Sequence, residues 1–192
     1  MFITSHVVNC QQRKLIVHRG GAISETLQPE PWLRGTLQEV PPVQRAVMHA
    51  LELAGEDLRR WCGSFSDEQV NARPGGLPPV AFHLRHIARS LDRLLTYAEG
   101  RDLNKQQLTG LKEEMNPEAT SDALFSELNS ALAKSMARVQ ALDVSVFEQI
   151  RAVGRKQLPT TVAGLLVHVA DHTQRHVGQA VTTAKVVMAR PA

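Results

Sequence analysis

Cysteine is nearly absent from this sequence, which contains only Cys10 and Cys62. The two residues stand far apart and outside any C-x-x-C arrangement, so the sequence indicates neither a disulfide framework nor a thiolate zinc site. The first residues also lack the long apolar region of a secretory signal, and their few apolar residues precede the basic ones. We therefore expect a cytoplasmic protein.

Aromatic residues are also scarce, and neither sign of charge is in large excess. Aromatic residues make up 4% of the chain, and the net charge is only +3 because acidic residues are interleaved with the basic ones. Few aromatic side chains are thus available to stack on bases, which makes nucleic acid a poor candidate partner. The apolar stretches are interrupted by His, Arg or Asp, well short of the roughly 20 residues needed to cross a bilayer. We expect no nucleic acid partner and no membrane association.

The first 40 residues differ from the rest of the chain. Glycine and proline interrupt them, and they have no sustained helical period, although residues 14–18 (KLIVH) have the composition of a short strand. We interpret residues 1–40 as an irregular N-terminal extension and residues 41–192 as one folded domain. The chain is 43% hydrophobic, which is enough for a sizeable core.

Apolar residues recur at helical intervals in four segments of the domain. Prolines precede the first two segments, Ser121 is the expected N-cap of the third, and Thr160 or Thr161 is the expected N-cap of the fourth. The predicted helices span about residues 42–61, 82–100, 121–142 and 160–188. The pattern leaves residues 147–153 open between a short strand and a turn. Four long helices without a convincing series of strands predict an all-α four-helix bundle, with room for a crossover before the third helix.

Five of the eight histidines fall in the second and fourth predicted helices. His172 and His176 are four residues apart, so they lie about 6 Å apart along one helix face and can reach one metal ion. His168 and His176 are about 12 Å apart along the axis, which is too far for one ion to be shared by all three. A third ligand from the facing helix, either His83 or His86, would complete a three-histidine site with an open position, which is typical of catalytic metals.

A metal-free interpretation competes with this one. A single histidine on an apolar face is usually buried and hydrogen bonded to a backbone carbonyl, and we interpret His49 in that way. For the clustered histidines, the chemical alternative is a buried proton relay or acid–base group.

Two segments carry a resemblance to a known family. HIARS, which begins at His86, resembles the His-Ile-Ala-x-Ser segment of the DinB/YfiT-like superfamily of metal-binding four-helix bundles. HTQRHVGQ, which begins at His172, resembles the family's His-x-x-x-His-x-Gly-Gln run. The resemblance extends from Val43 to about Met188 and implies an up-down-down-up bundle.

The same resemblance implies a ligand set and a class of chemistry. It implies that His86, His172 and His176 bind a divalent transition metal, most often zinc or nickel, and that the protein is a homodimer. Some members of the family are transferases or isomerases that use a low-molecular-weight thiol. Three further histidines, His49, His83 and His168, go beyond this minimal triad. One of them could be an additional ligand or a partner that orients a ligand.

Three neutral imidazoles would leave the full +2 charge of the ion to lower the pKa of a bound thiol or water. A metal-dependent thiol S-transferase acting on a small molecule is therefore our first functional hypothesis. Hydrolysis is weaker, because no carboxylate has the spacing of the Glu in H-E-x-x-H, and no catalytic residue is assigned. The alternative is a non-catalytic protein, associated with stress, that binds a metal or a small ligand.

Arginines recur at four-residue intervals in the second predicted helix, at Arg85, Arg89 and Arg93. We interpret them as a solvated surface stripe. The sharper hypothesis is that Arg85 or Arg89 flanks the metal pocket and attracts an anionic substrate. In the fourth helix, the spacing predicts that Asp171 pairs with Arg175.

Overall fold

A computed structural model describes residues 28–116 and 119–189 of the chain. Four long helices dominate it, and each begins and ends within two residues of its predicted span. They are α1 (Pro42–Cys62), α3 (Val80–Ala98), α5 (Ser121–Ala141) and α6 (Val162–Met188). Thr161 caps α6 through a side-chain hydrogen bond to the first turn, as predicted. The predicted cap of α5 is wrong by one residue, because Thr120 makes the capping hydrogen bond and Ser121 is the first residue of the helix.

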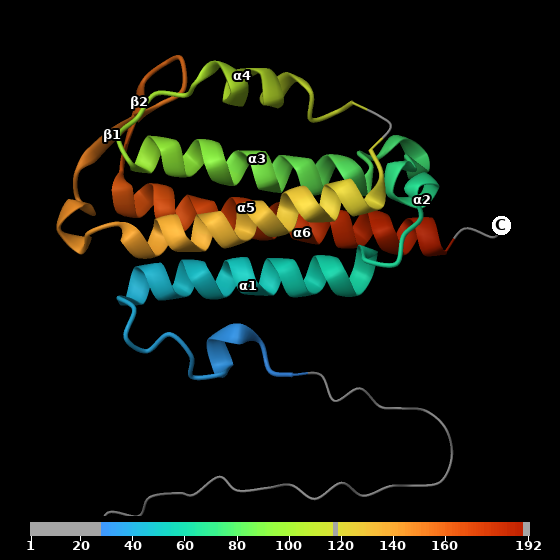
Figure 1. Ribbon diagram of the computed structural model, residues 1–192, viewed down its shortest axis with the longest axis horizontal. Helices are drawn as coiled ribbons and strands as arrows, with labels where there is room; N and C mark the ends of the chain where they lie inside the picture. The colour runs from blue at the N-terminus through green and yellow to red at the C-terminus, as the bar shows by residue number, and fades with distance from the viewer. Residues whose placement is uncertain (1–27, 117–118, 190–192) are drawn as a thin grey trace, which may run out of the picture.

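The four long helices form an up-down-down-up bundle (Figure 1). Helices α1 and α6 run in one direction, and α3 and α5 run in the other. Helix α6 packs against both α1 and α3. Helix α5 also contacts both α1 and α3, on the side away from α6. The predicted all-α fold and its topology are therefore confirmed. The parallel α3–α5 pair needs a long crossover, and the connection between them supplies it.

Shorter elements were missed in the sequence. The crossover contains a helix, α4 (Lys105–Lys112), and the connection between α1 and α3 contains α2 (Asp67–Asn71). Single 3-10 turns complete the connections: η1 (Pro31–Leu33), η2 (Pro74–Gly76) and η3 (Val144–Val146). Each of these elements is too short to display a helical period in its sequence.

A β-hairpin precedes α6. Strand β1 (Ile150–Val153) pairs in antiparallel fashion with β2 (Leu158–Thr161), so that Ile150 lies opposite Thr161. Of the two alternatives left open for residues 147–153, the short strand is right for the last four residues. The partner strand was not predicted, because it contains a proline and only four residues.

The end of the predicted N-terminal extension contacts the bundle. Arg34 donates hydrogen bonds to both carboxylate oxygens of Glu56 on α1, at 2.6 and 2.7 Å. Val40, just before α1, is buried. The segment 14–18, expected to have strand-like composition, lies outside the described residues, and the boundary at residue 41 stays a prediction.

The core follows the heptad spacing of the helices. Leu51 and Leu58 on α1 and Leu84 and Leu91 on α3 are seven residues apart and fully buried. Each buried leucine side chain contributes roughly 2 kcal/mol relative to an exposed one, so this seam accounts for much of the bundle's stability. Within the described residues, no helix is long and apolar enough to cross a membrane.

Cys62 belongs to this core rather than to any site. Its side chain is buried at the end of α1, and burial raises the pKa of its thiol to about 12. A protonated, enclosed thiol is a poor nucleophile and a poor metal ligand. Cys10 lies outside the described residues.

Candidate metal centre

Three histidines meet between the antiparallel helices α3 and α6. His172 and His176 lie one turn apart on α6, and His86 on α3 faces them. The Nε2 atoms of His86 and His172 are 2.8 Å apart, and the ring centroids of His86 and His176 are 4.2 Å apart. One nitrogen of each ring lies within 4.8 Å of the others, and all three side chains are partly exposed. The structure thus brings together the three residues that the family resemblance implied.

His83 lies directly behind this group. Only 2% of the residue is exposed, and its Nδ1 is 3.2 Å from the Nδ1 of His176. Because this hydrogen bond occupies Nδ1 of His176, it leaves the opposite nitrogen, Nε2, to face a ligand. The structure therefore places His83 as a partner that orients His176.

The other two additional histidines lie farther from the group. His168 is exposed at the edge, with its ring 5.3 Å from that of His172 and its Nδ1 4.0 Å from the carboxylate of Asp171. His49 is buried on α1, where its Nε2 forms a 3.1 Å hydrogen bond with the hydroxyl of Thr36. His49 is therefore buried and hydrogen bonded as predicted, but its partner is the Thr36 hydroxyl and not the expected backbone carbonyl.

Glu114 is the residue that the sequence did not predict. It follows α4 in the crossover, is buried, and accepts a 2.7 Å hydrogen bond from Nδ1 of His86. Its second oxygen accepts a 2.7 Å hydrogen bond from Arg93. Because an ionised carboxylate only accepts, Nδ1 of His86 carries the hydrogen, and its Nε2 is the nitrogen that faces His172.

Burial alone would raise the pKa of Glu114. Hydrogen bonds from His86 and Arg93, together with their charges, outweigh that effect and hold the pKa below its ordinary value. The carboxylate is therefore ionised at neutral pH. A buried anion next to a metal ligand makes that ligand a stronger donor.

Three of the imidazoles are neutral at physiological pH. Burial, followed by the charges of neighbouring histidines, lowers the pKa of His83, His172 and His176 to about 4 in each case. Metals bind the unprotonated nitrogen of an imidazole. Because the folded chain keeps these rings neutral, their unprotonated nitrogens stay available to a metal ion. Phe82 adds an apolar wall, since its ring stacks on His86 at a centroid distance of 5.3 Å.

These residues fit a divalent transition metal. Three neutral nitrogen donors on two rigid helices suit zinc or nickel, and two of the rings have partners that fix their orientation. The partly exposed side leaves room for a further ligand, as at catalytic rather than structural metal sites.

The interpretation of the α3 arginines as a surface stripe is wrong for two of them. Arg93 is buried against Glu114, and Arg89 reaches away from the histidines to Glu127 on α5 and to the carbonyl of Gly110. Arg89 therefore does not flank the metal pocket. Arg85 donates a hydrogen bond to the carbonyl of Asn116, on the segment that follows Glu114.

On α6, the predicted pair of Asp171 and Arg175 is present. Their side chains meet in a hydrogen-bonded ion pair of 2.6 Å on the exposed side of the helix. This pairing keeps the Asp171 carboxylate away from the three clustered imidazoles.

The fold and this site define a class: four-helix bundles with a three-histidine site that could hold a metal ion. The profile of the DinB superfamily matches residues 50–180, more than half of the chain. The protein belongs to the DinB superfamily.

Two solved structures share the fold. A conserved protein from Enterococcus faecalis has 20% sequence identity and a TM-score of 0.64, with 78% of this chain and 99% of that chain covered. YfiT from Bacillus subtilis has 17% identity and a TM-score of 0.56, with 74% of this chain and 86% of that chain covered. YfiT is described as a probable metal-dependent hydrolase with an unusual four-helix bundle topology. A comparison with curated protein sequences gave no match.

Proposed function

We propose that this protein is a metal-dependent enzyme that transfers a low-molecular-weight thiol to a small electrophile, with His86, His172 and His176 as the metal ligands. The observation that carries the proposal is the convergence of one nitrogen from each of three partly exposed imidazoles, within 4.8 Å of one another. We propose zinc or nickel as the ion, because both accept this donor set.

The chain's own residues prepare the site for a nucleophile. Glu114 holds His86 by its Nδ1, and His83 does the same for His176. Phe82 excludes water from one side of the rings. A divalent ion bound here would lower the pKa of a thiol or a water molecule that joins it.

The surrounding carboxylates favour a thiol over water. Among the described residues, Glu114 is the carboxylate that hydrogen bonds to the triad, and both of its oxygens are engaged by His86 and Arg93. Asp171 is exposed and paired with Arg175. Neither is free to act as a general base for water, whereas a thiol ionises more readily and has less need of one.

Hydrolysis is the second candidate, and the likeness to YfiT favours it, because that protein is described as a probable metal-dependent hydrolase. The two reactions share the metal and differ in the nucleophile. A ligand-binding protein without turnover, associated with stress, is the third possibility.

One assay separates these candidates. Untagged protein reconstituted with zinc or nickel is mixed with cysteine or glutathione and the electrophile 1-chloro-2,4-dinitrobenzene, and in parallel with nitrophenyl esters. We expect metal-dependent thioether formation that is lost in His172→Ala and kept in His49→Gln. Ester cleavage with that same pattern would favour the hydrolase. Tight metal binding without turnover in either assay would favour the binding protein.

The proposed homodimer has a separate test. Light scattering coupled to gel filtration should give about twice the 21.2 kDa mass of the chain. A monomer mass at all concentrations would reject the dimer without affecting the metal site. Cytoplasmic location and the absence of a nucleic acid partner also stay predictions.

A further inference from the structure

A groove of about 1080 Å³ lies on the side of α3 that faces the crossover. Helices α3, α4 and α5 form its walls, and none of the three clustered histidines lines it. Its volume matches the upper range of small-molecule sites. The groove is therefore separate from the candidate metal centre.

Small side chains create the groove. Ala88 on α3 and Ala131, Ser135 and Ala137 on α5 line it, and these positions leave space between the longer side chains that also line it. Helix α4 has no buried residue, and its Leu108 and Leu111 are exposed.

Polar contacts hold α4 above this hollow. Arg89 donates a hydrogen bond to the carbonyl of Gly110, and Gln107 on α4 donates hydrogen bonds to Asp92 and Thr96 on α3. Figure 1 shows α4 running along the side of α3 that faces away from α1. Because hydrogen bonds hold α4 in place over small residues, there is space for a ligand between α4 and the α3–α5 pair.

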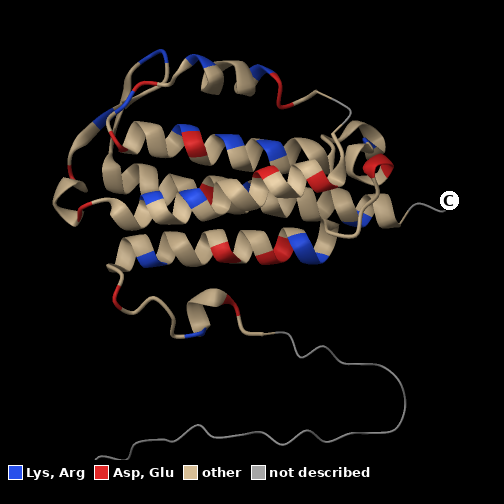
Figure 2. Ribbon diagram, viewed as in Figure 1, with Lys and Arg blue, Asp and Glu red and all other residues tan. Residues whose placement is uncertain are grey.

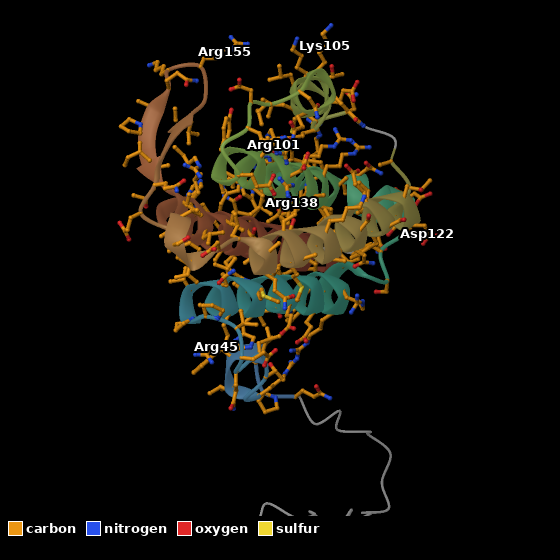
Figure 3. All side chains as sticks on the ribbon, turned by 60° about the vertical axis from the view of Figure 1, so that its left-hand side comes forward. Arg45, Arg101, Lys105, Asp122, Arg138 and Arg155 are labelled. Carbon is orange, nitrogen blue, oxygen red and sulfur yellow. The ribbon has the colours of Figure 1, made fainter. Side chains whose placement is uncertain are left out.

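The groove carries more cations than anions. Six basic side chains line it, against the three acidic side chains of Asp92, Glu113 and Glu127; the basic residues are Arg89, Arg93, Arg101, Lys105, Lys134 and Arg138. Figure 2 shows basic positions along α3, α4 and α5 on this side of the bundle, and Figure 3 labels Arg101, Lys105 and Arg138 there.

Carboxylates already engage the arginines but not the lysines. Each of the four arginines forms an ion pair, with Glu127, Glu114, Glu99 or Asp92. Lys105 and Lys134 form no ion pair with any described residue. Glu113, which also lines the groove, likewise forms no ion pair with any described residue. The two ammonium groups outnumber this one carboxylate and leave a net positive charge that an anion can neutralise.

We propose that the groove between α4 and the α3–α5 pair binds a small organic anion, with its carboxylate or phosphate group at Lys105 and Lys134 and its apolar part over the alanines. The paired arginines fix the shape of the site, and the two lysines attract the ligand. This inference does not depend on the proposed metal chemistry.

An NMR titration of the full-length chain tests the proposal. The probes are benzoate, phenyl phosphate and, as a cation of similar shape, benzylamine, all at constant ionic strength. We expect saturable shifts of backbone amides in α4 and around Ala131 with one or both anions, and none with benzylamine. Benzoate and phenyl phosphate together identify which head group the groove prefers.

Two variants and two controls complete the test. The double variant Lys105→Gln and Lys134→Gln should weaken anion binding by about tenfold, because each lysine supplies one close charge. Ala131→Leu should abolish it by filling the floor, and Lys112→Gln, outside the groove on the same helix, should leave it unchanged. His172→Ala should retain it, which separates the groove from an anion bound at a metal. No saturable shift in these amides, or equal affinity of the double variant and the wild type, would overturn the proposal.

Discussion

The two sides of helix α3 carry opposite kinds of chemistry. Toward α6, it contributes His83 and His86 to a group of neutral imidazoles served by one buried carboxylate. Toward α4 and α5, it contributes Arg89 to a groove of paired ions over small residues. Neutral donors suit a metal ion, because they do not cancel its positive charge. A charged groove suits a ligand of the opposite charge.

One contact joins the two sides. Arg93 lines the groove and donates a hydrogen bond to Glu114, whose other oxygen holds His86. The crossover that carries Glu114 therefore serves both regions.

Removing a ligand should have the largest effect. In His172→Ala, we expect zinc affinity to fall by at least about a thousandfold, because two imidazoles cannot hold the ion as three do. Competition against a chromophoric chelator measures the affinity. The matched control is His49→Gln, a buried histidine outside the group, which should bind zinc like the wild type. Equal affinities of wild type and His172→Ala would exclude the ligand role.

Removing the charge of Glu114 should weaken the site without removing a ligand. We expect Glu114→Gln to lower zinc affinity by about 10- to 100-fold, the usual effect of a lost partner behind a metal ligand. Glu113→Gln changes the exposed neighbour and should have no effect on zinc. Circular dichroism checks that both variants fold, and unchanged zinc affinity in a folded Glu114→Gln would contradict the orienting role.

Acid should destabilise the metal-free protein through its histidines. In the unfolded chain, histidine has a pKa near 6.5, whereas His83, His172 and His176 have pKa values of about 4 in the folded protein. Between these pH values, the unfolded chain binds more protons, so the free energy of unfolding decreases as the pH falls from about 6.5 to 4. Above pH 6.5, the contribution of these three histidines to the free energy of unfolding is fully present.

Urea unfolding at pH 7, 6 and 5 measures this dependence. The decrease should be smaller in His83→Gln, which removes one of the three groups. A free energy of unfolding that is constant from pH 7 to 5 would argue against neutral, buried imidazoles.

A change on the groove side should affect stability but not metal. Arg138 on α5 donates hydrogen bonds to Glu99 and Asp92 and ties α5 to α3. We expect Arg138→Gln to cost about 1 to 2 kcal/mol in the free energy of unfolding, because hydrogen bonds between charged groups are lost at a partly exposed site. Zinc affinity should not change, and a clear loss of zinc in this variant would show that the two sides are not independent.

The long elements could be predicted from the sequence because they repeat a pattern. Leu84 and Leu91 mark a helix through their spacing alone, and His172 and His176 mark one face of another. The third member of the cluster was not determined by spacing, since His83 and His86 are both on α3. The family motif favoured His86, and the structure assigns the two residues different places.

The features that could not be predicted depend on contacts between distant segments. Glu114 lies in a connection without any period, and its role exists only because the crossover brings it to His86 and Arg93. The same holds for Arg89, whose partner Glu127 lies on another helix. A pair of adjacent glutamates in a loop gives no signal that one of them is buried.

X-ray absorption spectroscopy of the untagged protein loaded with zinc counts the imidazoles bound to the ion. We predict three imidazole nitrogens at about 2.0 to 2.1 Å, completed by oxygen from solvent, at one zinc per chain. The same spectrum from Glu114→Gln should retain the three nitrogens. Fewer than three imidazoles, a sulfur ligand, or no stoichiometric zinc after reconstitution would contradict a metal centre made of His86, His172 and His176.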